Sequence, residues 1–183
     1  MKDENSGRIE SIHVAAKRGA ALQEIAAATL IAGRGIAGDR FCTANDAAAD
    51  SQVDSRGDPH SDHRGDPQGD AQVSLVEAEQ IESFAQSAGF AFEARHTRRN
   101  MVTRGVALNA LVGKVFSVGE VTLRGVELAE PCAHLAGMLI KQFDLPAAEP
   151  KQIVAGLVHR GGLYATIVRG GTIRPGDQVV VES

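Results

Sequence analysis

Short runs of alternating apolar and polar residues, separated by glycines, recur along this chain and constrain its fold more than any other feature. Clear examples are Arg8 to Val14, Val121 to Leu128 and Leu163 to Val168. The runs follow one another at intervals of roughly ten residues, a spacing typical of small all-β domains. Alternation with a period of two places every second side chain on the same face of a sheet. The pattern therefore predicts a mostly β fold with a few helices, in which a closed or partly closed β-barrel holds the core.

Residues 43–71 interrupt this pattern. The part from Asp50 to Asp70 contains one aliphatic residue and repeats Arg-Gly-Asp-Pro twice. Such a segment cannot bury enough apolar area to offset its ordering entropy, so a mobile insertion is expected at about 43–71. His60 and His63, set among aspartates, could bind a metal, but a solvated loop is the simpler interpretation. The whole chain, 1–183, is then expected to form a single domain around this insertion.

Two helices are predicted with identifiable ends. Ser74 is placed as the N-cap of the first helix, with Glu77 completing a capping box and Gly89 ending the helix. The second helix is expected to start near Cys132 and to carry Leu135, Met138, Leu139 and Phe143 on its apolar face. Residues 23–31 fit either a strand or a short helix, and residues 96–103 are interpreted as a strand.

Composition excludes several classes of function. The net charge of −4 gives no field that would attract nucleic acid or an anionic membrane surface. No run reaches the roughly 18 apolar residues of a membrane span, and the polar N-terminus lacks the apolar stretch of a signal peptide. Two cysteines are too few for a disulfide framework or a four-thiolate zinc site. A cytoplasmic protein with reduced thiols is expected, although pairing of the two cysteines remains open.

Cys132 is the first candidate for chemistry. It follows a strand that ends at Glu130-Pro131, so it is expected at a strand-to-helix corner. The positive end of a helix there would favour a thiolate, the form that attacks carbon or sulfur, carries a persulfide or ligates a soft metal. The alternative is a buried, inert cysteine, which is common for free thiols.

Cys42 and His134 are secondary candidates. Cys42 lies beside Phe41 in a glycine-rich segment and is interpreted as a partly buried spacer. His134, two residues from Cys132, could act as its base or as a neighbouring ligand, but a solvent-facing histidine is the more common case. One Cys-x-His pair without two further ligands is weak support for zinc.

Arg98-Arg99-Asn100 is the best candidate for binding an anion. Guanidinium groups match phosphate oxygens, and an amide both donates to and accepts from the edge of a heterocycle. On a strand the two arginines would point to opposite faces, so only one would face a pocket. Pairing of an arginine with Asp39 or Glu130 would look identical in sequence. Asp39 and Arg40 form either part of the ligand site or a pair that locks a turn.

Several segments together resemble one family. The segments occur in a fixed order, and they are Gly35 to Arg40, Gln72 to Glu79, Arg98 to Val106, Leu108 to Phe116, Glu130 to Cys132, and Arg160 to Ala165 with Gly170 to Asp177. The chain resembles a MOSC domain, the module named for the C-terminal region of molybdenum cofactor sulfurases. The resemblance extends from about Gly7 to Val181.

The resemblance implies a MOSC-type β-barrel and a pocket for molybdenum cofactor (molybdopterin). It implies that Cys132 ligates molybdenum, and that the stretch Arg98 to Asn100 helps to bind the pterin, with Asp39 and Arg40 as further cofactor-binding candidates. Standalone bacterial relatives are associated with reduction of N-hydroxylated bases and similar small molecules. The family is also associated with pyridoxal phosphate.

The chain departs from the family pattern in three places. Residues 43–71 are longer and richer in Asp and His than a MOSC loop requires. The N-terminal region lacks the additional β-barrel domain of the N-hydroxylated-substrate reductases. Ala129 stands where relatives often have a second cysteine.

Three functions follow as hypotheses. The first is a molybdenum-dependent oxidoreductase component with Cys132 as metal ligand. The chain has no iron–sulfur cysteine set and no dinucleotide fingerprint, so a separate electron-transfer protein would supply the electrons. The second is a sulfur carrier whose Cys132 receives a persulfide from a cysteine desulfurase. The third is a non-catalytic module that binds a small anion or a partner protein.

Overall fold

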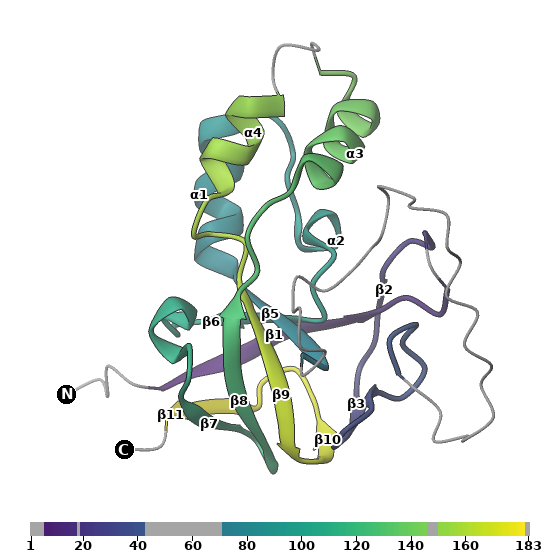
Figure 1. The fold of residues 1–183 in the computed structure, drawn as a ribbon, viewed down its shortest axis with the longest axis vertical. Coiled ribbons are helices and arrows are strands. Elements are labelled where there is room, and N and C mark those ends of the chain that lie inside the picture. Colours follow the sequence, from purple (N-terminus) through teal and green to yellow (C-terminus); the bar gives the residue numbers. More distant parts are fainter. Residues whose placement is uncertain (1–5, 18, 43–70, 146–149, 182–183) are drawn as a thin grey trace, which may run out of the picture.

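A closed barrel of seven strands forms the body of the molecule in the computed structural model, which describes residues 6–17, 19–42, 71–145 and 150–181. The order around the barrel is β11-β7-β8-β9-β5-β6-β1, and pairing of β1 with β11 closes it (Figure 1). The barrel strands are β1 (Ser6–Val14), β5 (Val73–Glu77), β6 (Met101–Arg104), β7 (Val115–Val118), β8 (Val121–Leu128), β9 (Leu163–Arg169) and β11 (Gln178–Val181). All neighbouring pairs in the barrel are antiparallel except β5 and β6, which are parallel.

Smaller strands extend the barrel at one side. Strand β2 (Gln23–Glu24) pairs with the end of β1. A separate sheet has the order β10-β3-β4 and contains β10 (Gly171–Ile173), β3 (Ala28–Ile31) and β4 (Gly35–Ile36). Residues 23–31 therefore form two strands, which resolves the ambiguity of their sequence pattern.

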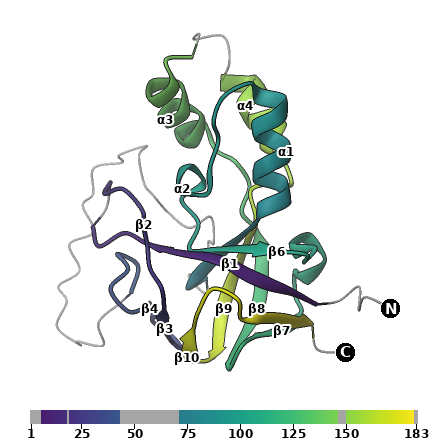
Figure 2. The same ribbon diagram turned by 180° about the vertical axis from the view of Figure 1, so that it is seen from behind.

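The helices gather at one end of the barrel. They are α1 (Ala78–Ala88), α2 (Ala94–Thr97), α3 (Ala133–Phe143) and α4 (Pro150–Leu157), with a short 3-10 turn, η1 (Leu108–Leu111), at the barrel wall. Helices α1 and α2 lie in the crossover that joins the parallel strands β5 and β6, and α3 and α4 lie between β8 and β9. The rear view shows α1, α3 and α4 standing together above the strands (Figure 2). No described helix is long and apolar enough to cross a membrane.

The two larger apolar clusters of the described residues hold these parts together. The barrel interior is filled mainly by aliphatic side chains with Phe116 at full burial, as the low aromatic content of 4% requires. The helical end has a second cluster in which phenylalanines supply much of the volume. Phe84, Phe90 and Phe92 contact one another edge to face, with ring centroids 4.9–6.4 Å apart. Helix α3 thus packs in a cluster distinct from the barrel interior, together with α1, α4 and the outward-facing Val76 and Val102.

Two predictions of local structure are wrong. Ser74 is not an N-cap: it lies within β5, and the helix begins at Ala78 with Glu77 as its cap residue. Pairing of β5 with two neighbours and the bonds of Ser74 to Asn100 outweigh the local capping signal. Gly89 ends the helix in the left-handed conformation, with φ of 75°, as predicted.

The segment before Met101 is also not a strand. Residues Ala94–Thr97 form α2, because the Glu93 N–H donates to His96 Nδ1 (2.9 Å) and the Thr97 hydroxyl donates to the Ala94 carbonyl (2.7 Å). The strand starts only at Met101. Residues 43–70 of the insertion predicted at about 43–71, including His60 and His63, lie outside the described residues.

Candidate functional site

Cys132 stands at the corner between β8 and α3, as the sequence predicts. It is the N-cap residue of α3, with an extended backbone (φ −118°, ψ 164°), and its carbonyl accepts the Ala136 N–H at 3.2 Å. The side chain is exposed. The alternative in which Cys132 is buried is therefore wrong. An accessible sulfur at the positive end of an eleven-residue helix can act as a metal ligand or a nucleophile.

The segment that leads to Cys132 is fixed from the neighbouring strand. The Ala129 N–H donates to the Gly162 carbonyl at 2.8 Å. Gly161 lies so close that a Cβ there would come within 1.9 Å of the Ala129 carbonyl oxygen. Only glycine permits this approach of the two backbones. The Gly161-Gly162 pair thus sets the position from which the chain continues to Cys132.

The side chain of Arg99 also fixes the segment that leads to Cys132. Its guanidinium donates through Nε to the Gly161 carbonyl (2.8 Å), through Nη1 to the Tyr164 hydroxyl (3.1 Å) and through Nη2 to the Ala129 carbonyl (3.1 Å). The residue is only 9% exposed, and its guanidinium carbon lies 5.1 Å from the centre of the Tyr164 ring. Arg99 therefore holds three protein oxygens around the base of the Cys132 segment.

Asn100, the next residue, connects this part of the chain to Ser74 and to the turn at Asp39. Its Oδ1 accepts the N–H and the hydroxyl of Ser74, at 3.2 and 3.1 Å. Its Nδ2 donates to the His13 carbonyl (3.3 Å) and to Asp39 Oδ2 (3.4 Å). Asp39 in turn accepts the backbone N–H groups of Ala15 and Phe41, each at 3.1 Å. Both side chains are buried, and these bonds agree with the alternative in which Asp39 locks a turn.

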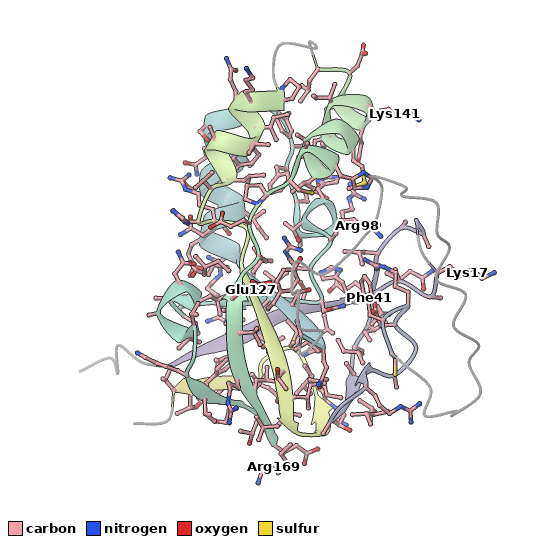
Figure 3. All side chains as sticks on the ribbon, viewed as in Figure 1. Lys17, Phe41, Arg98, Glu127, Lys141 and Arg169 are labelled. Atoms are coloured by element: carbon pink, nitrogen blue, oxygen red, sulfur yellow. The ribbon has the colours of Figure 1, made fainter. Side chains whose placement is uncertain are left out.

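Arg98 and Arg40 are the half-buried arginines of this region. Arg98 is the C-cap of α2 in the left-handed conformation (φ 62°), and its Nη1 donates to the Ala20 carbonyl at 2.8 Å. Arg40 lies over the Phe41 ring at 4.3 Å, and its N–H donates to the Ala15 carbonyl. Figure 3 shows Arg98 between α3 and the β1–β2 region that carries Lys17, with Phe41 on the same flank. Arg98 and Arg99 point in different directions because they lie on a turn. The prediction that they diverge through alternation along a strand is wrong.

The turn of residues 98–100 is thus the centre of the candidate site. Arg99 connects it to the Cys132 segment, and Arg98 and Asn100 connect it to the β1–β2 loop and the turn at Asp39. The residues predicted for cofactor binding are therefore linked in one hydrogen-bonded region. Cys42 is half-buried, and its N–H donates to the Asp39 carbonyl at 2.9 Å. His134 is exposed on the first turn of α3.

The donor set decides which kind of metal site is possible. Among the described residues, no group of three or more His, Cys, Asp or Glu side chains could hold a metal ion. The described side chains alone therefore do not complete a metal site at Cys132. This donor set fits a metal delivered within an organic cofactor and disfavours a zinc site made by described side chains alone.

A cavity of about 460 Å³ lies elsewhere, between the helices of the barrel end. It is lined by Phe84, Ser87, Ala88, Phe90, Leu145, Gln152, Ile153 and Gly156. None of the predicted site residues lines it, so it is a separate feature of the aromatic cluster.

The model of the MOSC domain family matches residues 52–180, more than half of the chain. The chain belongs to the MOSC family. Search of curated proteins returned no match. Among solved structures, this MOSC protein is similar to the YuaD protein from Bacillus subtilis, with 19% identity, a TM-score of 0.76, and coverage of 97% of this chain and 96% of that one. It is also similar to YiiM from Escherichia coli, with 15% identity, a TM-score of 0.61, and coverage of 97% and 70%. These likenesses show that the fold is shared.

Sequence reasoning missed three residues that shape the site. Tyr164 bonds to Arg99. Glu130 pairs with His159 across 29 residues of sequence. Glu130 and Tyr164 stand in segments that mark the family, but no sequence signal indicated the contacts of these three residues, because Arg99 and Tyr164, like Glu130 and His159, are far apart in sequence.

Proposed function

We propose that this MOSC protein binds molybdenum cofactor at Cys132 and reduces N-hydroxylated bases or similar small molecules. The observation that carries the proposal is the exposed thiol of Cys132 at the N-terminus of α3, held in place by Arg99 and the Gly161-Gly162 pair. Molybdenum is soft enough to take a thiolate ligand. The cofactor would supply the remaining metal ligands and the redox chemistry.

The residues predicted for cofactor binding take two roles in this proposal. Arg98 and Arg40 offer guanidinium groups to the cofactor's phosphate. Arg99, Asn100 and Asp39 are buried as well as hydrogen-bonded within the protein, so we assign them the positioning of the site. Electrons would come from a separate redox protein.

Metal analysis tests the proposal directly. The wild type, expressed in a host that makes the cofactor, should contain molybdenum, and Cys132→Ser should lose it. Cys42→Ser is the matched control and should keep it, because the contact described for Cys42 is made by its backbone N–H, which the change leaves in place. Wild-type protein without molybdenum from such a host would contradict the proposal.

A sulfur carrier is the second candidate, since the same accessible thiol can hold a persulfide. Incubation with a cysteine desulfurase and cysteine should then add one sulfur, a mass of about 32 Da, at Cys132. Intact mass spectrometry of wild type and Cys132→Ser would show it. If Cys132→Ala changes neither metal content, sulfur transfer nor any phenotype, the module is a non-catalytic binder.

A further inference from the structure

Glu130, two residues before Cys132 in the sequence, forms an oriented pair with His159. The Glu130 carboxylate accepts the His159 Nδ1–H at 2.6 Å through one oxygen and the His159 backbone N–H at 2.9 Å through the other. The imidazole is nevertheless 69% exposed and the carboxylate 42%. Surface pairs of this type usually contribute little to stability. Here, however, the two hydrogen bonds between Glu130 and His159 fix the direction of an accessible imidazole.

The backbone of His159 is also held in an uncommon conformation. Its φ of 59° lies in the left-handed region, which is uncommon for residues other than glycine, although asparagine, aspartate and histidine adopt it more often than the rest. The Asn109 side chain donates to the His159 carbonyl at 2.8 Å, which adds a contact from η1. Strained residues that neighbouring groups hold in place are concentrated at functional sites. If residue 159 served only to provide a left-handed conformation after α4, glycine would suit this position equally well.

The tautomer follows from these contacts. Because Nδ1–H donates to the carboxylate, Nε2 of the neutral ring is the acceptor, and among the described residues it contacts no partner. A carboxylate that orients a histidine in this way is the usual arrangement behind a general acid or base. The exposed Nε2 can take up a proton from solvent and pass it on.

Glu130 belongs to the segment that leads to the proposed metal ligand. It is two residues before Cys132, and two residues span at most about 7 Å of chain. The carboxylate therefore ties an imidazole from the α4–β9 loop to the segment that ends at Cys132. Among the described contacts, Glu130 is the residue of the β8–α3 segment whose side chain contacts that loop.

We propose that His159, oriented by Glu130, is the proton donor of the Cys132 site. The inference deepens the proposed function and rests on it. Reduction of an N-hydroxylated amine breaks the N–O bond, places two electrons from the redox partner on the substrate and consumes two protons, giving the amine and water. His159 supplies the proton that leaves with the oxygen as water, and solvent reprotonates its exposed ring. Glu130 is a positioning residue.

Chemical rescue is the main test. Glycine suits the left-handed backbone at position 159, so His159→Gly should fold and retain molybdenum like the wild type. Turnover should fall roughly a hundredfold and recover substantially when free imidazole is added. Glu130→Gln should lower turnover in the wild-type background but not further in His159→Gly. Unchanged turnover in His159→Gly, or a loss that imidazole does not restore, would overturn the proposal, as would a rescuable loss in His134→Ala instead.

A second measurement needs no cofactor. A nitroxide attached to Cys132 in the Cys42→Ser chain should strongly broaden the ring signals of His159 in NMR spectra. Reduction of the nitroxide should restore these signals. If the ring signals stay sharp, His159 does not face Cys132 and the inference fails. A wild type that lacks both molybdenum and turnover would count against the proposed function, and this measurement would still decide the placement of His159.

Discussion

Arg99 donates from Nη2 to the main-chain carbonyl of Ala129 at 3.1 Å, across 30 residues of sequence. The bond joins the turn before β6 to the segment that ends at Cys132. A carbonyl buried at this point needs a donor, because an unsatisfied buried acceptor costs about 1–3 kcal/mol. The same guanidinium satisfies Gly161 and Tyr164, so the geometry of the candidate site depends on one side chain.

Arg99→Lys should lower the free energy of unfolding by about 3 kcal/mol or more, since an ammonium group cannot reach three acceptors arranged around a planar fork. Urea unfolding followed by circular dichroism would measure it. Arg95→Lys is the control: Arg95 pairs with Glu93 at 3.0 Å, but the two side chains are 62% and 53% exposed. That change should stay within about 0.5 kcal/mol. Equal effects of the two changes would show that Arg99 does not hold the site.

Gly161→Ala should destabilise the protein by more than about 2 kcal/mol and disturb the Cys132 segment, because the new Cβ would lie 1.9 Å from the Ala129 oxygen. Gly137→Ala is the matched change within α3, where a Cβ meets no atom within 4 Å. It should raise stability by roughly 0.5–1 kcal/mol through helix propensity. Thermal unfolding of both variants gives the comparison. A stable Gly161→Ala protein would contradict the close backbone approach.

The sequence allowed prediction of the barrel and the Cys132 corner, but it placed Arg98 and Arg99 on a strand rather than on a turn. The barrel and the corner leave local signals: alternation, a proline before a helix and glycines at turns. The roles of Arg99 and Asn100 could not be predicted, since their acceptors at Ala129, Gly161 and Asp39 come from distant segments. Ser74 shows the opposite failure. Its local capping signal is strong, but strand pairing and its bond to Asn100 override it.

The two cysteines should differ in reactivity towards a thiol reagent. Cys132 is exposed and Cys42 is half-buried on the turn at Asp39. A native sample should therefore show one fast-reacting thiol and a slower second one, which a colorimetric disulfide reagent resolves in time. Cys132→Ser should remove the fast phase and Cys42→Ser the slow one. Loss of the fast phase in Cys42→Ser would contradict the assignment.

His96 makes stability depend on pH. Burial among aromatic side chains lowers the pKa of His96 below its ordinary value of 6.5, and the nearby Arg95 lowers it further, against a smaller opposing effect of Glu93. The ring packs against Phe143 of α3 with centroids 5.0 Å apart. Its Nδ1 accepts the Glu93 N–H, so the neutral form suits this position. Burial lowers the pKa of His13 in the same direction, with Glu24 opposing it.

A histidine with a lowered folded-state pKa binds fewer protons in the folded state than in the unfolded state, so stability is lost as pH falls. The contribution is complete above about pH 6.5, the ordinary value of the unfolded chain, and declines below it until the folded-state pKa is reached. Denaturant unfolding at pH 7.5 and 5.5 (roughly one unit on either side of that value) should show lower stability at the acidic pH. His96→Gln should reduce this difference, while His13 maintains the remainder. A difference unchanged by His96→Gln would show that the buried ring between α2 and α3 does not govern it.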